Sequence, residues 1–375
     1  MVFRKFIKPL LAAAALFAIM AQPAAAQSGG SNVEQQIING VIQNIVESVR
    51  DQIMRRRLTP PPVGMNHFSA EESDFNSKDP FAAKGMSNPF GALAYAKSPI
   101  LAAPPPSAWL YGVNLIGNGD RAISIAAQTH IETITGAFDV TKIGIFTATD
   151  ALTFIGTGSH TWSRAETPAL PALPFVVDSS IPSASGTLSY LNGGFSADFT
   201  ALASWTRSRT NAPLVVIPDS SSIAYTGNAQ YRFDFPYSVW FEPTAGVTYT
   251  EVYTANFGTK LADTTEVHGG GRVGTEMKWM GFTIQPVLSG AVFRIVDSNF
   301  VPVLGPVPAG AVPTPGVLGG RGSGKITVLW TPNFSSYLEV HGSGIASTKT
   351  VQPPLGNPAA VDTIGAQAGL RYTWN

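Results

Sequence analysis

The sequence predicts an all-β protein, a closed antiparallel transmembrane β-barrel of about 12 strands preceded by a signal peptide and one amphipathic helix. Three observations lead to this fold class. Charged residues make up 13% of the chain, about half of the ~25% that is usual in soluble domains. From Trp109 onward apolar and polar residues alternate with a period of two, as in strands. Short and long connections between these strands also alternate, as in barrels of the outer membrane.

The first 26 residues have the features of a cleaved secretory signal peptide. Basic residues at Arg4, Lys5 and Lys8 precede an apolar stretch from Leu10 to Met20, and the small residues Ala24–Ala26 follow. The apolar stretch is too short for a membrane-spanning helix. We therefore expect residues 1–26 to be removed and the mature protein to leave the cytoplasm.

Residues 27–107 are predicted to form a short helical segment and a linker. Ser31 and Glu34 make a capping box, and apolar residues recur at helical spacing through residues 31–57. Pro60–Pro62 ends this helix, and a stretch rich in Pro, Ser and Ala continues to residue 107. The apolar stripe of the helix favours self-association, while docking elsewhere in the envelope and plugging of the pore are the alternatives.

Residues 108–375 are predicted to form the barrel, with one polar and one apolar face on each strand. In Val267–Trp279 every charged residue falls on one face, and Tyr225–Phe235, Phe195–Trp205 and Phe241–Thr250 repeat the pattern. In a membrane barrel the apolar face contacts lipid and the polar face lines the lumen. The charged or ionisable residues predicted to face the lumen are Asp198, Arg232, Asp234, Glu242, His268, Arg272, Glu276, Lys278, Lys325, Glu339 and Arg371.

The connections between the predicted strands distinguish a membrane barrel from a soluble sandwich. Long connections at 164–182, 207–221, 254–265, 297–321 and 347–361 alternate with short ones at 192–194, 236–238, 280–281 and 331–335. Outer-membrane barrels have tight periplasmic turns and longer external loops, whereas a Greek-key sandwich has no reason to keep this alternation. An even number of strands places both ends of the barrel on the periplasmic side.

The last strand is expected to pair with the first, because an open edge in hydrocarbon would leave backbone groups unpaired. Its lipid-facing residues Leu370, Tyr372 and Trp374 form a C-terminal assembly strand, although the chain ends on Asn375 rather than on an aromatic residue. Aromatic residues at strand ends are placed as interfacial girdles would be. They are Trp109, Tyr111, Trp162, Trp205, Tyr231, Tyr249, Trp279, Trp330, Tyr372 and Trp374.

Composition and motifs indicate neither cofactor, metal nor nucleic acid. The chain has no cysteine and a net charge of +0, so it has no thiol chemistry and no basic nucleic-acid footprint. Gly319–Lys325 differs from a phosphate-binding loop in having Ile326 after the lysine, with a strand following. His268–Gly271 resembles an oxyanion loop but lacks the Gly-x-Ser-x-Gly motif of hydrolases.

We expect that the chain is not an enzyme. Its five histidines show no spacing typical of metal ligands. The alternative is a serine hydrolase in the barrel wall, built around His268 and His341, which both face inward by parity. The lumenal charges are interpreted as ion pairs that brace the barrel or tune ion passage, with a merely solvated face as the alternative.

Several segments resemble the autotransporter β-barrel domain of Gram-negative bacteria. They are Gly186–Phe199, Tyr231–Phe233 leading to Trp240–Tyr249, and the ending Gly369–Tyr372. The resemblance covers residues 108–375. It implies an outer-membrane pore that carries an N-terminal passenger to the cell surface, with a helix in the lumen. It also implies lipid of the outer membrane, the Sec export pathway and the barrel-assembly machinery as partners.

The chain departs from this family in its N-terminal part. Residues 27–107 are too few for a β-helical passenger and lack that fold's repeats. The predicted helix ends about 50 residues before the first strand, and the junction has no Asn-Asn pair of the autocleaving kind. The expected function is therefore a translocator or pore domain with a very short or degenerate passenger. The alternative is a porin-like passive channel or a structural outer-membrane protein.

Overall fold

The computed structural model describes residues 109–123, 128–147, 150–167, 175–211, 218–300, 316–346 and 362–374. The predicted signal peptide (1–26), the helix (31–57) and the linker lie outside these ranges, so they and the helix-mediated self-association stay predictions. No helix in the described part of the chain is long and apolar enough to cross a membrane.

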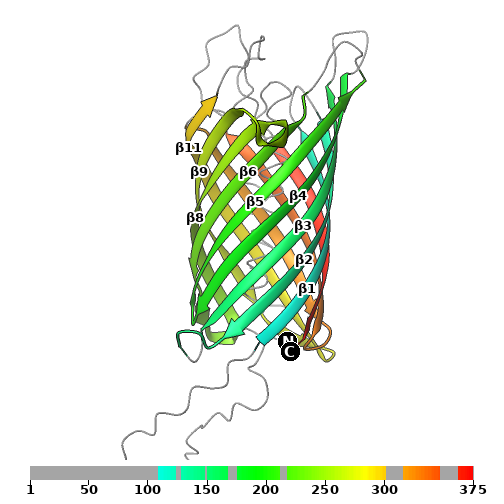
Figure 1. Ribbon diagram of the computed structural model, residues 1–375. Coiled ribbons are helices and arrows are strands. Elements are labelled where there is room, and N and C mark those ends of the chain that lie inside the picture. Colours follow the sequence, from blue (N-terminus) through cyan, green and yellow to red (C-terminus); the bar gives the residue numbers. More distant parts are fainter. Residues whose placement is uncertain are drawn as a thin grey trace, which may run out of the picture.

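The described residues form one antiparallel sheet of fourteen strands (Figure 1). The strands are β1 (Trp109–Ile123), β2 (Gln128–Ile143), β3 (Ala151–Thr167), β4 (Phe175–Asn192), β5 (Phe195–Thr210), β6 (Ser220–Tyr231), β7 (Phe233–Phe235), β8 (Val239–Thr254), β9 (Lys260–Thr275), β10 (Met277–Trp279), β11 (Phe282–Phe300), β12 (Leu318–Leu329), β13 (Phe334–Ala346) and β14 (Asp362–Trp374). Because β7 continues β6 and β10 continues β9 after a one-residue interruption, fourteen minus two leaves twelve barrel strands.

The sheet closes on itself because β14 pairs with β1. Thirteen residue pairs join these two strands, from Tyr111 opposite Trp374 to Ile123 opposite Asp362. Closure gives the backbone groups of both edge strands a partner, which hydrocarbon could not supply. The strands run obliquely around the barrel in Figure 1. The predicted closed antiparallel barrel of twelve strands is confirmed.

The two ends of the barrel differ in their connections. At the turn end, where β1 begins and β14 ends, residues 193–194, 236–238, 280–281 and 330–333 make tight links. At the loop end, residues 301–317 and 347–361 make the longest ones. The strands extend beyond the predicted bounds, so the link predicted at 164–182 is reduced to 168–174. Gly281 has φ +87°, a left-handed conformation that allows a two-residue hairpin.

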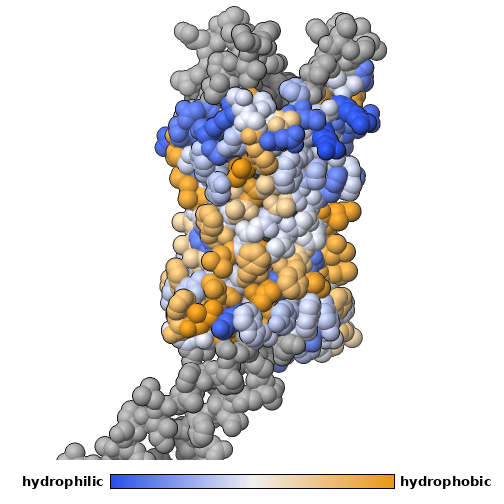
Figure 2. Space-filling view, in the orientation of Figure 1, coloured by the Kyte–Doolittle hydropathy of each residue, from blue (hydrophilic) through white to orange (hydrophobic). Residues whose placement is uncertain are grey.

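The side chains are arranged the opposite way from those of a soluble protein. Apolar residues in mid-strand are exposed on the outer face, among them Phe199 at 54% and Leu338 at 58%. Polar residues fill the inner positions, where Thr161 and Thr187 are fully buried. Figure 2 shows apolar residues over the middle and lower wall and hydrophilic residues along the upper margin. An apolar outer wall around a polar interior is the arrangement of a barrel immersed in lipid.

Aromatic side chains mark the turn end of the outer face. Trp109, Trp279, Trp330 and Tyr372 are all exposed there, and Tyr111 stacks on Trp374 with ring centroids 6.0 Å apart. At the loop end Trp162 and Trp205 occupy the corresponding level on β3 and β5, followed by charged residues. The predicted assembly residues Leu370, Tyr372 and Trp374 alternate with inward-facing Arg371 on β14.

We predict that a charge in the middle of the outer wall destabilises the barrel far more than the same charge at its rim. Phe199→Arg is expected to cost about 2–4 kcal/mol, and Phe195→Arg, on the same strand at the turn end, about 0–1 kcal/mol, because the cost of a lipid-facing arginine falls with distance from the bilayer midplane. Urea unfolding of the full-length protein in lipid vesicles measures both. Equal unfolding midpoints for the two variants would show that hydrocarbon does not cover this face.

Candidate functional site: the lumen of the barrel

The predicted lumenal charges lie on the inner wall, mostly towards the turn end. Seven are buried, namely Asp198, Glu242, His268, Arg272, Lys325, Glu339 and Arg371. The side chains of Arg232 and Glu276 are 10% and 28% exposed. Asp234 and Lys278 lie on the short extensions β7 and β10 and are exposed at the turn-end mouth. Four further charged residues of the inner wall, Asp120, Asp139, Glu266 and Arg321, were not among those predicted.

Most of these charges are neutralised by partners on neighbouring strands. Arg272 donates from Nε to Glu242 Oε1 at 3.1 Å, and the two residues are directly opposed on β9 and β8. Lys325 Nζ lies 3.6 Å from Glu339 Oε2, to which Gln367 also donates at 2.8 Å. Such buried pairs replace lost hydration with mutual attraction, so the inner wall carries little unpaired charge.

Arg232 belongs to a further cluster at the turn-end mouth. Its Nε donates to Asp234 at 2.7 Å, its Nη2 lies 3.7 Å from Glu276, and its guanidinium stacks 5.0 Å from the ring of Trp240. Trp240 packs against Val287 in a small cluster of buried apolar residues. The guanidinium group of Arg232, stacked on Trp240, therefore forms part of the inner wall at this mouth.

Two side-chain contacts cross the closing seam between β1 and β14, an Arg–Asp ion pair and a His–Asp contact. Arg371 on β14 donates to Asp139 on β2 at 2.8 Å and so reaches over β1. It passes Gly112, where a Cβ atom would overlap Asp139 and lie 2.9 Å from Arg371 Nη2. Both side chains are almost fully buried, at 2% and 1% exposed. The missing side chain of Gly112 is what lets two strands that are not neighbours form an ion pair.

The second seam pair repeats this arrangement one strand along. His341 on β13 contacts Asp120 on β1 at 2.7 Å, from Nε2 to Oδ1, and so reaches over β14. The residue between them is Gly365, whose Cβ would overlap Asp120 and lie 2.7 Å from His341 Nε2. The pairing of β1 with β14 is thus reinforced by two side-chain contacts. Arg371–Asp139 spans β1, and His341–Asp120 spans β14.

A third glycine allows the same kind of contact away from the seam. His268 on β9 donates from Nε2 to Asn228 Oδ1 on β6 at 2.8 Å, across Gly246 on β8. Asn228 in turn donates to Asp198 on β5 at 2.8 Å. Side chains from three strands therefore form one chain of hydrogen bonds around the wall.

The inner face of β2–β6 and β8 is lined by hydroxyl groups, and we call it the hydroxyl wall. Its Ser and Thr side chains are directly opposed across neighbouring strands and hydrogen-bond in pairs. These pairs are Thr133–Thr161 (2.9 Å), Thr141–Thr153 (2.8 Å), Thr157–Ser185 (2.5 Å), Ser159–Ser183, Ser179–Ser208 (2.8 Å), Thr187–Thr200 (2.8 Å), Ser204–Ser222 (2.6 Å) and Thr226–Thr248 (3.1 Å). The hydroxyl wall thus has few charged side chains, Asp139, Asp198 and Glu242, and the remaining strands carry most of the lumenal charge.

At the turn end, one carboxylate fixes the connection between β2 and β3. The backbone amides of Ile145 and Phe146 donate to Asp150 at 2.8 and 2.9 Å, and Tyr190 Oη donates at 3.4 Å. Burial by itself would raise the pKa of Asp150. The hydrogen bonds together lower the pKa by more than burial raises it, so the pKa lies below the ordinary value. The turn is thus built around a carboxylate that stays ionised.

The motifs that resemble catalytic loops lie within strands. The phosphate-loop-like stretch Gly319–Lys325 is part of β12, and His268–Gly271 is part of β9. Among the described residues, no group of three or more His, Cys, Asp or Glu side chains could hold a metal ion.

No protein-family model matches the chain, and no curated protein matches its sequence significantly. Among solved structures, the β domain of the Bordetella autotransporter BrkA matches with a TM-score of 0.50 and 14% identity, covering 71% of this chain and 99% of that one. The chain has the autotransporter barrel fold. The translocator domain of NalP from Neisseria meningitidis has a TM-score of 0.46 and 8% identity, with coverage of 70% and 88%. The transport unit of AIDA-I from Escherichia coli has a TM-score of 0.43 and 10% identity, and the match covers 72% of this chain and 92% of that one.

The autotransporter fold is the one expected from the resemblance of residues 108–375. Its outer wall is apolar and its lumen polar, as in barrels of the outer membrane. At this level of identity the likeness to BrkA concerns the fold alone.

We predict that Gly112→Ala destabilises the barrel by about 1–3 kcal/mol, because the added methyl group pushes Asp139 away from Arg371 and leaves buried charges poorly paired. Gly117→Ala on the same strand is the matched control, since a Cβ there meets nothing within 4 Å. Urea unfolding in lipid vesicles measures both.

A double variant tests the assignment to the ion pair. If the methyl group acts through Asp139, Gly112→Ala adds little further destabilisation in an Asp139→Asn background. Additive losses, or equal midpoints for Gly112→Ala and Gly117→Ala, would contradict the seam ion pair.

Proposed function

We propose that residues 108–375 are an outer-membrane translocator domain of autotransporter type, and that residues 27–107 are a very short N-terminal passenger. The observation that carries the proposal is topological. β1 begins at the turn end beside the end of β14, in a closed barrel whose two longest connections, 301–317 and 347–361, are at the other end.

This topology fixes where the N-terminal segment joins the barrel. In outer-membrane barrels the tight turns face the periplasm and the long loops face outward. The chain before Trp109 is therefore attached at the periplasmic mouth. Because a closed barrel has no lateral gap, this segment can reach the cell surface only through the lumen.

The inner wall suits the passage of an extended chain. Ser and Thr hydroxyls can rotate to donate or accept, so the hydroxyl wall can satisfy successive backbone groups without preferring one sequence. The charges of the lumen are held by partners in the wall, as in the Arg272–Glu242 and Lys325–Glu339 pairs. A passing segment therefore meets few unpaired charges that would trap it.

The proposal includes a route to the membrane. We infer export through the Sec pathway by the predicted signal peptide, followed by insertion through the barrel-assembly machinery. Leu370 and Tyr372, which alternate with Arg371 on β14, supply the outward-facing apolar positions at the end of the last strand.

Protease treatment of intact cells tests the translocator. An epitope inserted between residues 28 and 31 of the full-length protein is expected to be cleaved from outside. An epitope in the 347–361 connection should be cleaved as well, whereas one in the 193–194 turn should be protected until the outer membrane is permeabilised.

Protection of the N-terminal epitope together with cleavage in the 347–361 connection would reject translocation. The hydroxyl wall would then favour the second candidate, a porin-like passive channel. Single-channel recording distinguishes it, since a channel conducts as the full-length protein whereas a purely structural barrel does not.

We also propose that the chain is not an enzyme. Structural roles account for the two inward-facing histidines, since His268 contacts Asn228 and His341 contacts Asp120 across glycine gaps. We expect the folded full-length protein to hydrolyse p-nitrophenyl esters of short and long chains no faster than the same sample after denaturation. Hydrolysis that is lost in His268→Ala, with folding retained, would reverse this.

A further inference from the structure

The outer face of β1–β5 carries a row of basic residues near the loop end. Arg121, His130, Arg164 and Arg209 lie on β1, β2, β3 and β5, and register places them in one line around the barrel, with Asp178 of β4 between the last two. All of them are exposed. One step closer to the membrane centre, Arg207 on β5 lies opposite Ser180 on β4. We call these five basic residues the arginine row.

The level of this row follows from the length of β5. Its outward residues run from Phe195 at the turn end to Trp205, an eleven-residue segment. A tilted strand crosses the hydrocarbon core in about 9–11 residues. Trp205 therefore lies at the outer interface, and Arg207 and Arg209 lie at the level of the lipid headgroups. On β3, Trp162 is followed by Arg164 in the same way.

The arginines differ in how far the protein already satisfies them. Arg164 pairs with Glu166 at 3.0 Å and lies 4.0 Å from Asp178, and Arg121 donates to Gln128 at 2.8 Å. Arg207 and Arg209 make no ion pair with any residue in the described ranges. The carboxylates of this face are Glu132, Glu166 and Asp178, against four guanidinium groups.

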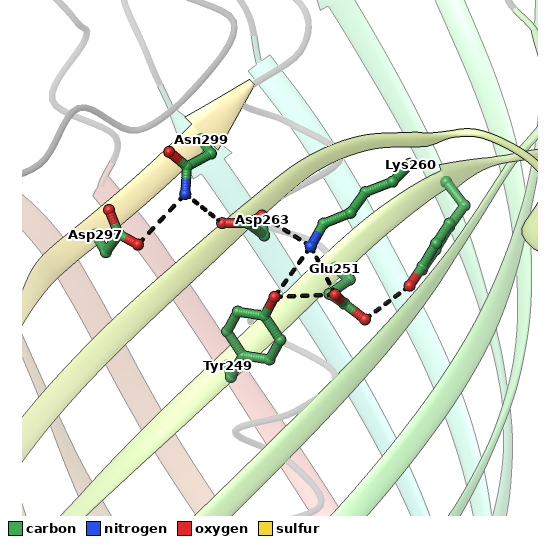
Figure 3. A network of polar contacts seen from close by, with 7 residues as sticks. Tyr249, Glu251, Lys260, Asp263, Asp297 and Asn299 are labelled. Atoms are coloured by element: carbon green, nitrogen blue, oxygen red, sulfur yellow. Dashed lines mark hydrogen bonds and ion pairs between the residues drawn. The ribbon is translucent and has the colours of Figure 1, made fainter. Parts of the chain in front are cut away.

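On the opposite side of the outer rim, a lysine is held by carboxylates of the protein itself. There Lys260 Nζ contacts Glu251 at 2.7 Å, Asp263 at 2.8 Å and Tyr249 Oη at 3.0 Å (Figure 3). Asn299 donates to Asp263 at 2.9 Å and to Asp297 at 3.3 Å. Two carboxylates contact this lysine, and the third, Asp297, accepts a hydrogen bond from Asn299, so the charge of Lys260 is already paired within the protein.

We propose that the arginine row binds phosphate groups of anionic lipid in the leaflet that faces the loop end, with Arg207 and Arg209 as its principal pair. Guanidinium groups hold phosphate oxygens through paired, charge-assisted hydrogen bonds. Two steps along a strand separate Arg207 from Arg209 by about 7 Å between Cα atoms, so both can reach one headgroup. Their position on the lipid-facing wall, directly beyond Trp205, selects a lipid phosphate over a phosphate dissolved in water.

Native mass spectrometry of the full-length protein, folded in a neutral detergent, tests the site with dioleoyl phosphatidic acid as the probe. The unmodified protein is expected to retain this lipid in preference to dioleoyl phosphatidylcholine, whose phosphate is masked by choline. Arg207→Gln/Arg209→Gln is expected to weaken phosphatidic acid binding at least about tenfold, because several charge-assisted hydrogen bonds are lost.

The control variant removes the same charge from other parts of the outer face. Lys142→Gln/Arg294→Gln alters one residue of β2 near the turn end and one residue of β11, and should bind phosphatidic acid as the unmodified protein does. Asp178→Asn, which removes the carboxylate opposite Arg209, should strengthen binding. Folding of each variant is checked by its heat-dependent migration in gels.

Three results would overturn the proposal. The first is unchanged binding in Arg207→Gln/Arg209→Gln, and the second is an equal loss in Lys142→Gln/Arg294→Gln, which would indicate general charge attraction. The third is displacement of the lipid by millimolar inorganic phosphate, which would assign the site to soluble phosphate. Loss of translocation has no bearing on these measurements, so the two proposals fail independently.

Discussion

The structure depends on one constraint, the cost of an unpaired backbone group in hydrocarbon. A sheet immersed in lipid can satisfy this constraint only by closing, and the thirteen residue pairs between β14 and β1 complete the closure. Closure then determines the distribution of side chains, because each strand has one face towards lipid and one towards the lumen. The result is a protein whose buried residues are mainly Ser, Thr and paired charges and whose exposed residues are mainly apolar.

The closing seam is also the place where side chains contribute most beyond the backbone. Two side-chain pairs, Arg371–Asp139 and His341–Asp120, connect strands that are not hydrogen-bonded neighbours. Each connects the two ends of the barrel domain, since their partners are 232 and 221 residues apart in the sequence. Contacts of such long range form only after most of the chain has been placed. They therefore favour the closed barrel over an open sheet with the same strand pairs.

The sequence was sufficient to predict the fold, because the period-two pattern and the connection lengths both result from the membrane. It also indicated the face of Arg272 and Glu242, since parity alone decides which side a strand residue occupies. Parity does not reveal partners two strands away, so the Arg371–Asp139 contact across Gly112 could not be predicted. The hydroxyl wall was not predicted, although the alternating threonines of Gln128–Ile143 signal it. Trp240 and Ile155 are apolar residues at inward positions, where the alternation predicts polar ones. Their burial follows from packing, which the alternation does not reveal.

The glycine gaps in the inner wall have a consequence for how this chain can vary. Gly246 has room for nothing but hydrogen because Asn228 and His268 meet above it. A larger residue at position 246 can be accommodated only if Asn228 or His268 is first replaced by a residue with a shorter side chain. The reverse also holds, since a glycine without the bridging pair would leave an unfilled gap in the wall. Substitutions at these three positions are therefore strongly epistatic, and among homologous barrels they should change together as a triplet drawn from three different strands.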